Sequence, residues 1–159
     1  MKVTHATLVA LVAAIILTSV AAAGPEAAKQ RVVINMKIYP QKTFVLTPLR
    51  AGPLEPDSGK ISSNWLSIRG RTVMRDGQVV TIYDGGVATL TGKRGTLTIR
   101  DRNEWVAVES GEDAVAFSTW KVVRGTGQYA GIVGKGRGGH AGLGNPRWYA
   151  RYEGLLNSP

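Results

Sequence analysis

The sequence predicts an all-β fold, a small antiparallel β-barrel of about eight strands, with a β-sandwich as the alternative. Short apolar or alternating runs recur along the chain, and Gly, Pro and Asp interrupt them about every eight to twelve residues. Helical periodicity is poor throughout. We favour the barrel because closure removes exposed strand edges and because the chain's 20 glycines suit sharp bends.

The clearest β pattern lies in residues 114–140. An apolar, β-branched run is interrupted by glycines at 125 and 127, resumes through Tyr129 and Val133, and gives way to a second glycine cluster at 134–139. This pattern is typical of a β-hairpin with tight or bulged corners. It indicates the fold class and offers no catalytic constellation.

The expected strands are the apolar runs between turn residues. They cover residues 31–39, 43–47, 65–74, 78–83, 87–91, 96–100, 104–108, 114–124, 129–135 and 147–156. Asp76-Gly77 between two such runs predicts a hairpin, and corners are expected at 84–86, 92–95, 101–103 and 109–113. Strict alternation in 96–100 places Leu97 and Ile99 in the core. In 31–39, the residues expected to face inward are Val33, Ile34, Met36 and Ile38.

The first 23 residues have the pattern of a secretory signal peptide. Lys2 gives a positive start, residues 6–20 are uncharged and mostly apolar, and Ala21-Ala22-Ala23 is a small-residue cleavage site. We therefore predict cleavage after Ala23 and a secreted or periplasmic protein, with no membrane span left after cleavage. The alternative is an uncleaved anchor, because the apolar stretch approaches the roughly 18 residues of a spanning helix.

The remaining chain has the length of one domain. We expect a flexible leader at 24–30 and a single β-barrel domain at 31–159, with a mobile Pro/Gly-rich loop at 48–60. Cysteine is absent, which excludes disulfide-stapled mini-proteins, thiol catalysis and zinc sites built from thiolates. Neither a metal nor a cofactor is expected.

Positive charge is the main bias of the composition. Without Lys2, nineteen Lys and Arg face eleven Asp and Glu, a net charge of +8. The basic residues are spread along the chain without a block of five or six, so a solvated basic surface is the default expectation. The alternative is that a basic face binds anionic lipid or surface polymer; nucleic acid is not expected as a partner.

Two segments carry a family resemblance. They are GTLTIRDRNEW at 95–105 and STWKVVRGTGQYAGIVGKGRG at 118–138. Their spacing of glycines and aromatic residues resembles that of the allene oxide cyclase barrel-like proteins, which are similar in shape to the lipocalin-like calycins and include exported bacterial members. The resemblance covers roughly residues 70–156 and implies a barrel, with Tyr129 as a packing residue at a corner. No catalytic residue of the plant cyclases matches here, so it implies no cyclase activity.

Two glycine patterns match phosphate-binding fingerprints, at residues 125–130 and 134–139. Such a loop holds phosphate only where a helix begins directly behind it, because the helix amides point at the phosphate oxygens. Further glycines follow both patterns, so we expect neither to bind a nucleotide.

His140 is the only histidine that remains after cleavage. A catalytic histidine needs a carboxylate or a second polar group to orient it. The carboxylates that could reach it in the folded chain are Glu104, Glu109, Glu112, Asp113 and Glu153. We take His140 with Glu153 as the candidate polar site, and an ordinary polar loop histidine as the alternative.

The aromatic residues predict a ligand pocket. Alternation in 147–153 places Trp148, Ala150 and Tyr152 on one face, and Arg151 and Glu153 on the other. A barrel mouth lined by tryptophans such as Trp65, with an arginine nearby, would hold a small amphipathic acid. The candidate ligand-binding residues are Trp105, Trp120, Tyr129, Trp148, Arg151 and Tyr152. Core packing is the alternative for each tryptophan.

Three functions fit these patterns. The first is a non-enzymatic exported barrel that binds a small apolar or weakly acidic ligand, or serves only as a stable domain. The second is a barrel isomerase or cyclase that acts by enclosing its substrate, and the third is binding of anionic surface polymer. An inward acid paired with Arg or Tyr would favour the enzyme. An unbroken apolar interior would favour core packing or ligand storage. A clustered basic face with a tightly packed interior would favour binding of surface polymer. The ligand's identity and the oligomeric state stay open.

Overall fold

The computed structural model describes residues 28–39, 41–107, 114–142 and 147–159, which are almost entirely β-strand. The strands are β1 (Lys29–Tyr39), β2 (Thr43–Pro48), β3 (Asp57–Ser63), β4 (Arg71–Arg75), β5 (Gln78–Gly92), β6 (Gly95–Ala107), β7 (Ala114–Gly125), β8 (Val133–Gly142) and β9 (Trp148–Asn157). Two short 3-10 turns are η1 (Trp65–Ser67) and η2 (Gly127–Tyr129). In these residues no helix is long and apolar enough to cross a bilayer.

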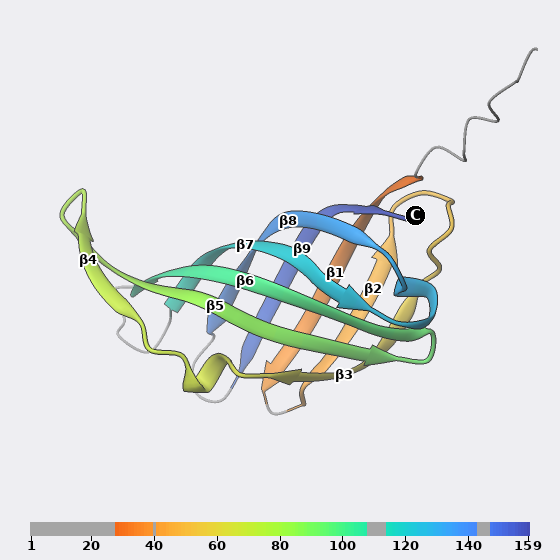
Figure 1. The fold of residues 1–159 in the computed structure, drawn as a ribbon. Helices are drawn as coiled ribbons and strands as arrows, with labels where there is room; N and C mark the ends of the chain where they lie inside the picture. The colour runs from red at the N-terminus through yellow and green to blue at the C-terminus, as the bar shows by residue number, and fades with distance from the viewer. Residues whose placement is uncertain (1–27, 40, 108–113, 143–146) are drawn as a thin grey trace, which may run out of the picture.

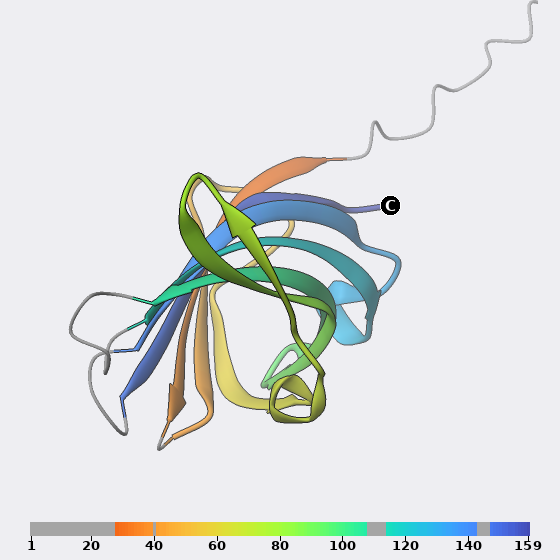
Figure 2. The ribbon, with the colours of Figure 1, turned by 90° about the vertical axis from the view of Figure 1, so that its left-hand side faces the viewer.

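The nine strands form one antiparallel sheet in the order β3-β2-β1-β9-β8-β7-β6-β5-β4. β3 also pairs with β5, from Gly59 opposite Gly92 to Ser63 opposite Ala88. Eight strands therefore close into a barrel-like ring, while β4 pairs only with β5 and projects with it as a hairpin (Figures 1 and 2). The predicted antiparallel barrel-like fold is confirmed.

The interior of the ring is filled by inward side chains from all around the sheet. Leu97 and Ile99 are fully buried, as their alternation predicts. On β1, Ile34 and Met36 face the core as expected, but Val33 lies on the opposite face of the strand, outside the main core cluster. Further core residues are Val32, Phe44, Leu46, Leu90, Trp120, Tyr129, Tyr152 and Leu156.

Two expected corners are wrong, because the strands continue through them. Residues 84–86 form a β-bulge inside β5, where Gly85 adopts a φ of 83°. Residues 101–103 lie inside β6, paired with β5 and β7. These long strands carry inward side chains, Asp101 and Asn103 among them, to the end of the ring where β4 projects.

Other boundaries also differ from the prediction. Residues 65–74 are not one strand, because η1 and a short connection precede β4. The glycine cluster after Val133 does not end a strand; it is most of β8, and Tyr129 lies in η2 before it. The hairpin at Asp76-Gly77 is confirmed, with φ of 50° and 77°. The predicted signal peptide and the expected acidic turn at 109–113 lie outside the described residues.

Strand residues occupy part of the predicted leader and part of the predicted proline-rich loop. Lys29 and Gln30 belong to β1, and the loop ends at Pro56 because β3 begins at the next residue. The buried Gln30 amide holds the loop: its Oε1 accepts the Leu54 N–H at 2.9 Å, and its Nε2 donates to the Leu54 and Arg50 carbonyl oxygens at 3.2 and 2.7 Å. The loop is thus tied to β1 at both its start and its end.

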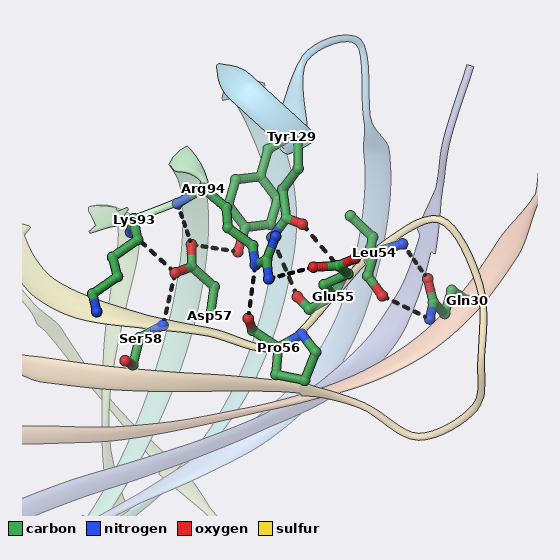
Figure 3. Close-up of polar contacts among 10 residues, drawn as sticks. Gln30, Leu54, Glu55, Pro56, Asp57, Ser58, Lys93, Arg94 and Tyr129 are labelled. Atoms are coloured by element: carbon green, nitrogen blue, oxygen red, sulfur yellow. Dashed lines mark hydrogen bonds and ion pairs between the residues drawn. The ribbon is translucent and has the colours of Figure 1, made fainter.

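Asp57 joins three segments (Figure 3). They meet at the end of the ring opposite β4, where β3 begins and β5 turns into β6 (Figure 1). Asp57 is 6% exposed, and its carboxylate accepts hydrogen bonds from the backbone N–H groups of Ser58 at 2.9 Å, Lys93 at 3.1 Å and Arg94 at 3.4 Å. The Tyr129 hydroxyl donates to the same carboxylate at 3.1 Å. One buried anion therefore holds the start of β3, the turn between β5 and β6, and η2 together, with all its donors supplied by the chain.

Replacing this acceptor tests its role. In Asp57→Asn, one oxygen becomes an NH₂ donor that faces other donors, so we expect the free energy of unfolding to fall by about 2–4 kcal/mol. Urea unfolding followed by circular dichroism measures the change. Asp76→Asn makes the same substitution in the exposed hairpin turn and should shift stability by less than about 0.5 kcal/mol. Equal effects of the two substitutions would contradict this assignment.

Candidate functional site

A pocket of about 620 Å³ opens at the end of the ring where the β4–β5 hairpin projects, the end that faces the viewer in Figure 2. Most of its wall is apolar and aromatic. Prominent lining residues are Trp65, Leu66, Ile68, Trp105, Val106 and Trp148. They come from η1 and the segment after it, and from the ends of β6 and β9, so the pocket exists only when the ring is closed.

Aromatic rings contact one another along one side of this pocket. The Trp105 and Trp148 rings lie 5.1 Å apart, edge to face. The His140 ring contacts both Trp65 and Trp105, with centroids 5.6 and 5.5 Å apart. Such edge and tilted contacts hold the rings in fixed orientations. His140 is therefore fixed between two indoles, at the inner end of the pocket.

A chain of buried hydrogen bonds begins at His140. Its Nε2 lies 2.8 Å from the Tyr152 hydroxyl oxygen, and that hydroxyl donates to Asp101 Oδ2 at 2.5 Å. The Trp65 indole N–H donates to the other carboxylate oxygen at 3.3 Å. Since Tyr152 gives its only proton to Asp101, its oxygen accepts from His140, and Nε2 must carry the histidine's hydrogen. Nδ1 is then a free acceptor, without a partner among the described residues.

A second polar pair lies beside this chain. Asn103 on β6 stands directly opposite Ser118 on β7, and the Ser118 hydroxyl donates to Asn103 Oδ1 at 2.5 Å. Both side chains are buried, and Asn103 also lines the pocket. The floor of the pocket is therefore polar, beneath apolar walls.

The sequence of β8 makes room for this arrangement. Along its inner face every second residue is a glycine except His140; the glycines are Gly134, Gly136, Gly138 and Gly142. A Cβ on Gly138 would collide with the Tyr152 ring, and one on Gly136 would lie 2.7 Å from the Trp120 ring. Because β8 has no side chains there, Trp120 and Tyr152 stack across it, with centroids 6.1 Å apart.

Burial sets the protonation states of the chain. It lowers the pKa of His140 to about 4, so the imidazole is neutral at pH 7. It raises the pKa of Asp101, against the hydrogen bond from Tyr152. It also raises the pKa of Tyr152, and the neighbouring Asp101 carboxylate adds to that effect. The network therefore holds a neutral histidine, a protonated phenol and a carboxyl with increased proton affinity.

The structure brings together some of the predicted site residues. The pocket of about 620 Å³ is lined by Trp65, Trp105, His140 and Trp148, and we call it the mouth pocket. Tyr152 lies below them and bonds to His140, while Trp120 packs against Tyr152 in the core.

Three other predicted residues lie elsewhere. Tyr129 sits at the opposite end of the ring, where it bonds to Asp57. Arg151 and Glu153 are on the outer face and form an ion pair with each other at 2.9 Å. Glu153 therefore does not reach His140, and Arg151 does not line this pocket. The acid that reaches His140 is Asp101, through Tyr152.

Asp101 and Asn103 are candidate functional residues that the sequence analysis assigns to a turn, and Ser118 is one that its place in a predicted strand does not single out. Asp, Arg and Asn in succession are typical of a corner, so residues 101–103 predict the end of a strand. The signal that identifies them is the continued alternation of Leu97, Ile99, Asp101, Asn103 and Trp105, all on one face of β6.

Two other expectations concern ligands. Among the described residues, no group of three or more His, Cys, Asp or Glu side chains could hold a metal ion. The second glycine fingerprint lies inside β8 and lacks the following helix that phosphate binding needs.

A scan against protein-family models and a search of curated proteins found no match for this chain. The case for a function therefore depends on the geometry of the site.

The lowered pKa of His140 links its protonation to folding. An unfolded histidine has a pKa near 6.5, and the folded one about 4. Between these values the unfolded chain binds a proton that the folded protein does not, so this group lowers the free energy of unfolding as the pH falls from 6.5 to 4. The loss is about 3 kcal/mol, at about 1.4 kcal/mol per pKa unit. Asp101 acts in the opposite direction, because its raised pKa favours the folded state as the pH falls through it.

His140→Gln isolates the histidine's share, since the glutamine amide can still donate to Tyr152 but does not titrate. We expect wild-type stability to fall more than that of the variant between pH 7 and pH 4, as measured by urea unfolding at several pH values. The Asp101 effect is common to both proteins and cancels in the difference. Parallel curves for the two proteins would contradict burial of a neutral His140.

Proposed function

We propose that the protein binds a small, largely apolar molecule with a weakly acidic head group in the mouth pocket. The observation that carries the proposal is the pocket of about 620 Å³ walled by Trp65, Trp105 and Trp148. Ligand pockets have volumes of about 300–1,000 Å³ and mostly apolar linings with a few polar groups. Tryptophan walls offer large apolar contact area with little loss of side-chain freedom.

The charges around the pocket favour an acid over a base. Lys42 is the one charged side chain among the described lining residues, and it is exposed at the rim. A carboxylate there would pair with Lys42 while the apolar body enters between the tryptophans. At the inner end, His140 Nδ1 can accept a hydrogen bond from a hydroxyl group, and the Asn103 amide NH₂ can donate one to a carbonyl group. The signal-peptide pattern supports the further proposal that binding takes place outside the cytoplasm.

Decanoic acid and 1-decanol test the pocket and its preference. We expect the acid to bind and to change tryptophan fluorescence, and we expect Trp105→Leu to weaken its binding by about tenfold, or about 1.4 kcal/mol. Phe117→Leu is the matched control, because Phe117 is 71% exposed on the neighbouring strand and lies outside the pocket. Isothermal titration calorimetry gives the affinities.

Lys42→Gln should remove the preference for the acid and leave binding of the alcohol unchanged. Absence of binding of both probes to the wild-type protein, or equal losses in Trp105→Leu and Phe117→Leu, would contradict the proposed pocket. Binding with no effect of Lys42→Gln would contradict the proposed head group only.

A second candidate function is that of an isomerase, and the inward acid Asp101 paired with Tyr152 favours it. In such a reaction His140 Nδ1 takes a proton from the carbon beside a carbonyl group, and the C–H electrons form the enolate. The Nε2 proton moves to Tyr152 as the Tyr152 proton moves to Asp101, so the charge is neutralised on the acid. Return of a proton to a different carbon gives the isomer. The neutral histidine and the raised pKa of Asp101 suit this direction of transfer.

Hydrogen exchange into 2-decanone in D₂O tests this candidate. If the network transfers protons, the wild-type protein should speed deuterium uptake beside the carbonyl above the buffer rate, as followed by mass spectrometry. Tyr152→Phe should reduce that uptake at least tenfold, since it breaks the path to Asp101, while 2-decanone still binds. Uptake at the buffer rate with bound 2-decanone would show that the network is structural, and the ligand-binding proposal would be unaffected.

A further inference from the structure

Another depression, of about 1210 Å³, crosses the outer face of β5, β6, β7, β8, β9 and β1. Seven basic side chains line it: Lys29, Arg31, Arg100, Arg102, Lys121, Lys135 and Arg137. We call this surface the basic groove. Asp84, Asp101 and Glu153 are the acidic residues of the lining, and the Asp101 carboxylate faces the interior of the ring. Charges that are scattered in the sequence are thus gathered by the fold.

The strand register places four of these cations in one row. Arg100 lies opposite Lys121, Lys121 opposite Lys135, Lys135 opposite Leu155, and Leu155 opposite Arg31. Neighbouring strands are about 4.8 Å apart, so the row extends for about 19 Å across the sheet. The row forms a line of positive charge that runs across the strands.

This row lacks the acidic partners found elsewhere on the surface. Arg102 pairs with Asp84 at 3.0 Å, and Arg75 with Glu104 at 2.6 Å. In the described part of the chain, no carboxylate lies within ion-pair distance of Arg31, Arg100, Lys121 or Lys135. Like charges directly opposite each other destabilise a sheet. The fold therefore carries an electrostatic cost that an anionic partner would relieve.

We propose that the basic groove binds a linear acidic polysaccharide, a chain of uronic acid units lying across the strands. Its carboxylates would pair with the row of Arg and Lys side chains, and arginine matches a carboxylate with two parallel hydrogen bonds. Neutral side chains of the groove can contact the sugar rings that carry the carboxylates. Thr119 and Asn157 line the groove and can bond to hydroxyl groups, and Leu155, 49% exposed, can contact the C–H face of a ring.

The groove fits other polyanions less well. Single-stranded nucleic acid binds on exposed aromatic rings, and the only aromatic residue of the lining, Trp120, is 3% exposed. A bilayer surface favours exposed apolar side chains that insert among the lipids, whereas Leu155 is the single exposed apolar side chain among the described lining residues. Polyphosphate offers no C–H face for Leu155. The groove and the mouth pocket are separate sites, so the two proposals stand independently.

The test uses the full-length protein and sodium polygalacturonate, with neutral dextran as the control polymer. We expect polygalacturonate binding in isothermal titration calorimetry at low salt, weakening linearly on a log–log plot as salt is added, and no binding of dextran. Lys121→Gln with Lys135→Gln should weaken binding more than tenfold and reduce the salt dependence. Lys60→Gln with Lys93→Gln makes the same change in net charge at exposed positions outside the groove and should leave binding within twofold.

Several results would overturn the proposal. The first is that the wild-type protein does not bind polygalacturonate at low salt. The second is that the two double variants lose equal affinity for polygalacturonate, which would mean that binding responds to net charge alone. Tighter binding to single-stranded DNA, to polyphosphate or to phosphatidylglycerol vesicles would assign the groove to a different partner. Circular dichroism and decanoic acid binding check that each variant is folded.

Discussion

The pairing of β3 with β5 closes the sheet, and the interior and the mouth pocket depend on that closure. The two strands are far apart in the order of the sheet and meet only because the sheet curls through eight strands. Asp57 holds the junction, since its buried carboxylate joins the first residue of β3 to the turn after β5 and to Tyr129. The tryptophans of the mouth come from segments on both sides of this junction. An open sheet with the same strands would expose the core and would have no pocket.

Glycine has two different uses in this barrel-like ring. At Gly85 it provides a positive φ for a bulge, which lets β5 bend without ending. Along the inner face of β8 it provides space, so that aromatic rings from β7 and β9 meet across a strand without side chains. His140 is the exception on that face, and it meets the polar floor of the pocket. The same pattern therefore explains the packing of the core and the isolation of one histidine among aromatic rings.

Alternation predicts the fold class, the inward tryptophans and the core of β6, because successive side chains in a strand point to opposite faces of the sheet. The turn signals are less reliable here, since Gly and Asp at 84–86 and 101–103 serve a bulge and an inward polar site instead of corners. The same alternation explains why Arg151 and Glu153 lie outside the mouth pocket: it directs Trp148 and Tyr152 into the ring and these two side chains to the outer face. The contact of Asp101 with Tyr152 joins residues that are 51 positions apart, and no local pattern contains it. The basic groove is hidden in the sequence for the same reason, because its cations become neighbours only through strand register.

The glycines of β8 leave the wall between interior and surface only one backbone thick. Trp120 lies directly beneath it, and its indole N–H donates to the carbonyl oxygen of Arg137, whose side chain borders the basic groove. On its inner side the same indole stacks on Tyr152, the middle member of the polar chain. One chromophore thus touches both the outer groove and the buried network. A change in either environment would therefore reach the Trp120 ring, which couples the outer groove to the buried network through a single side chain.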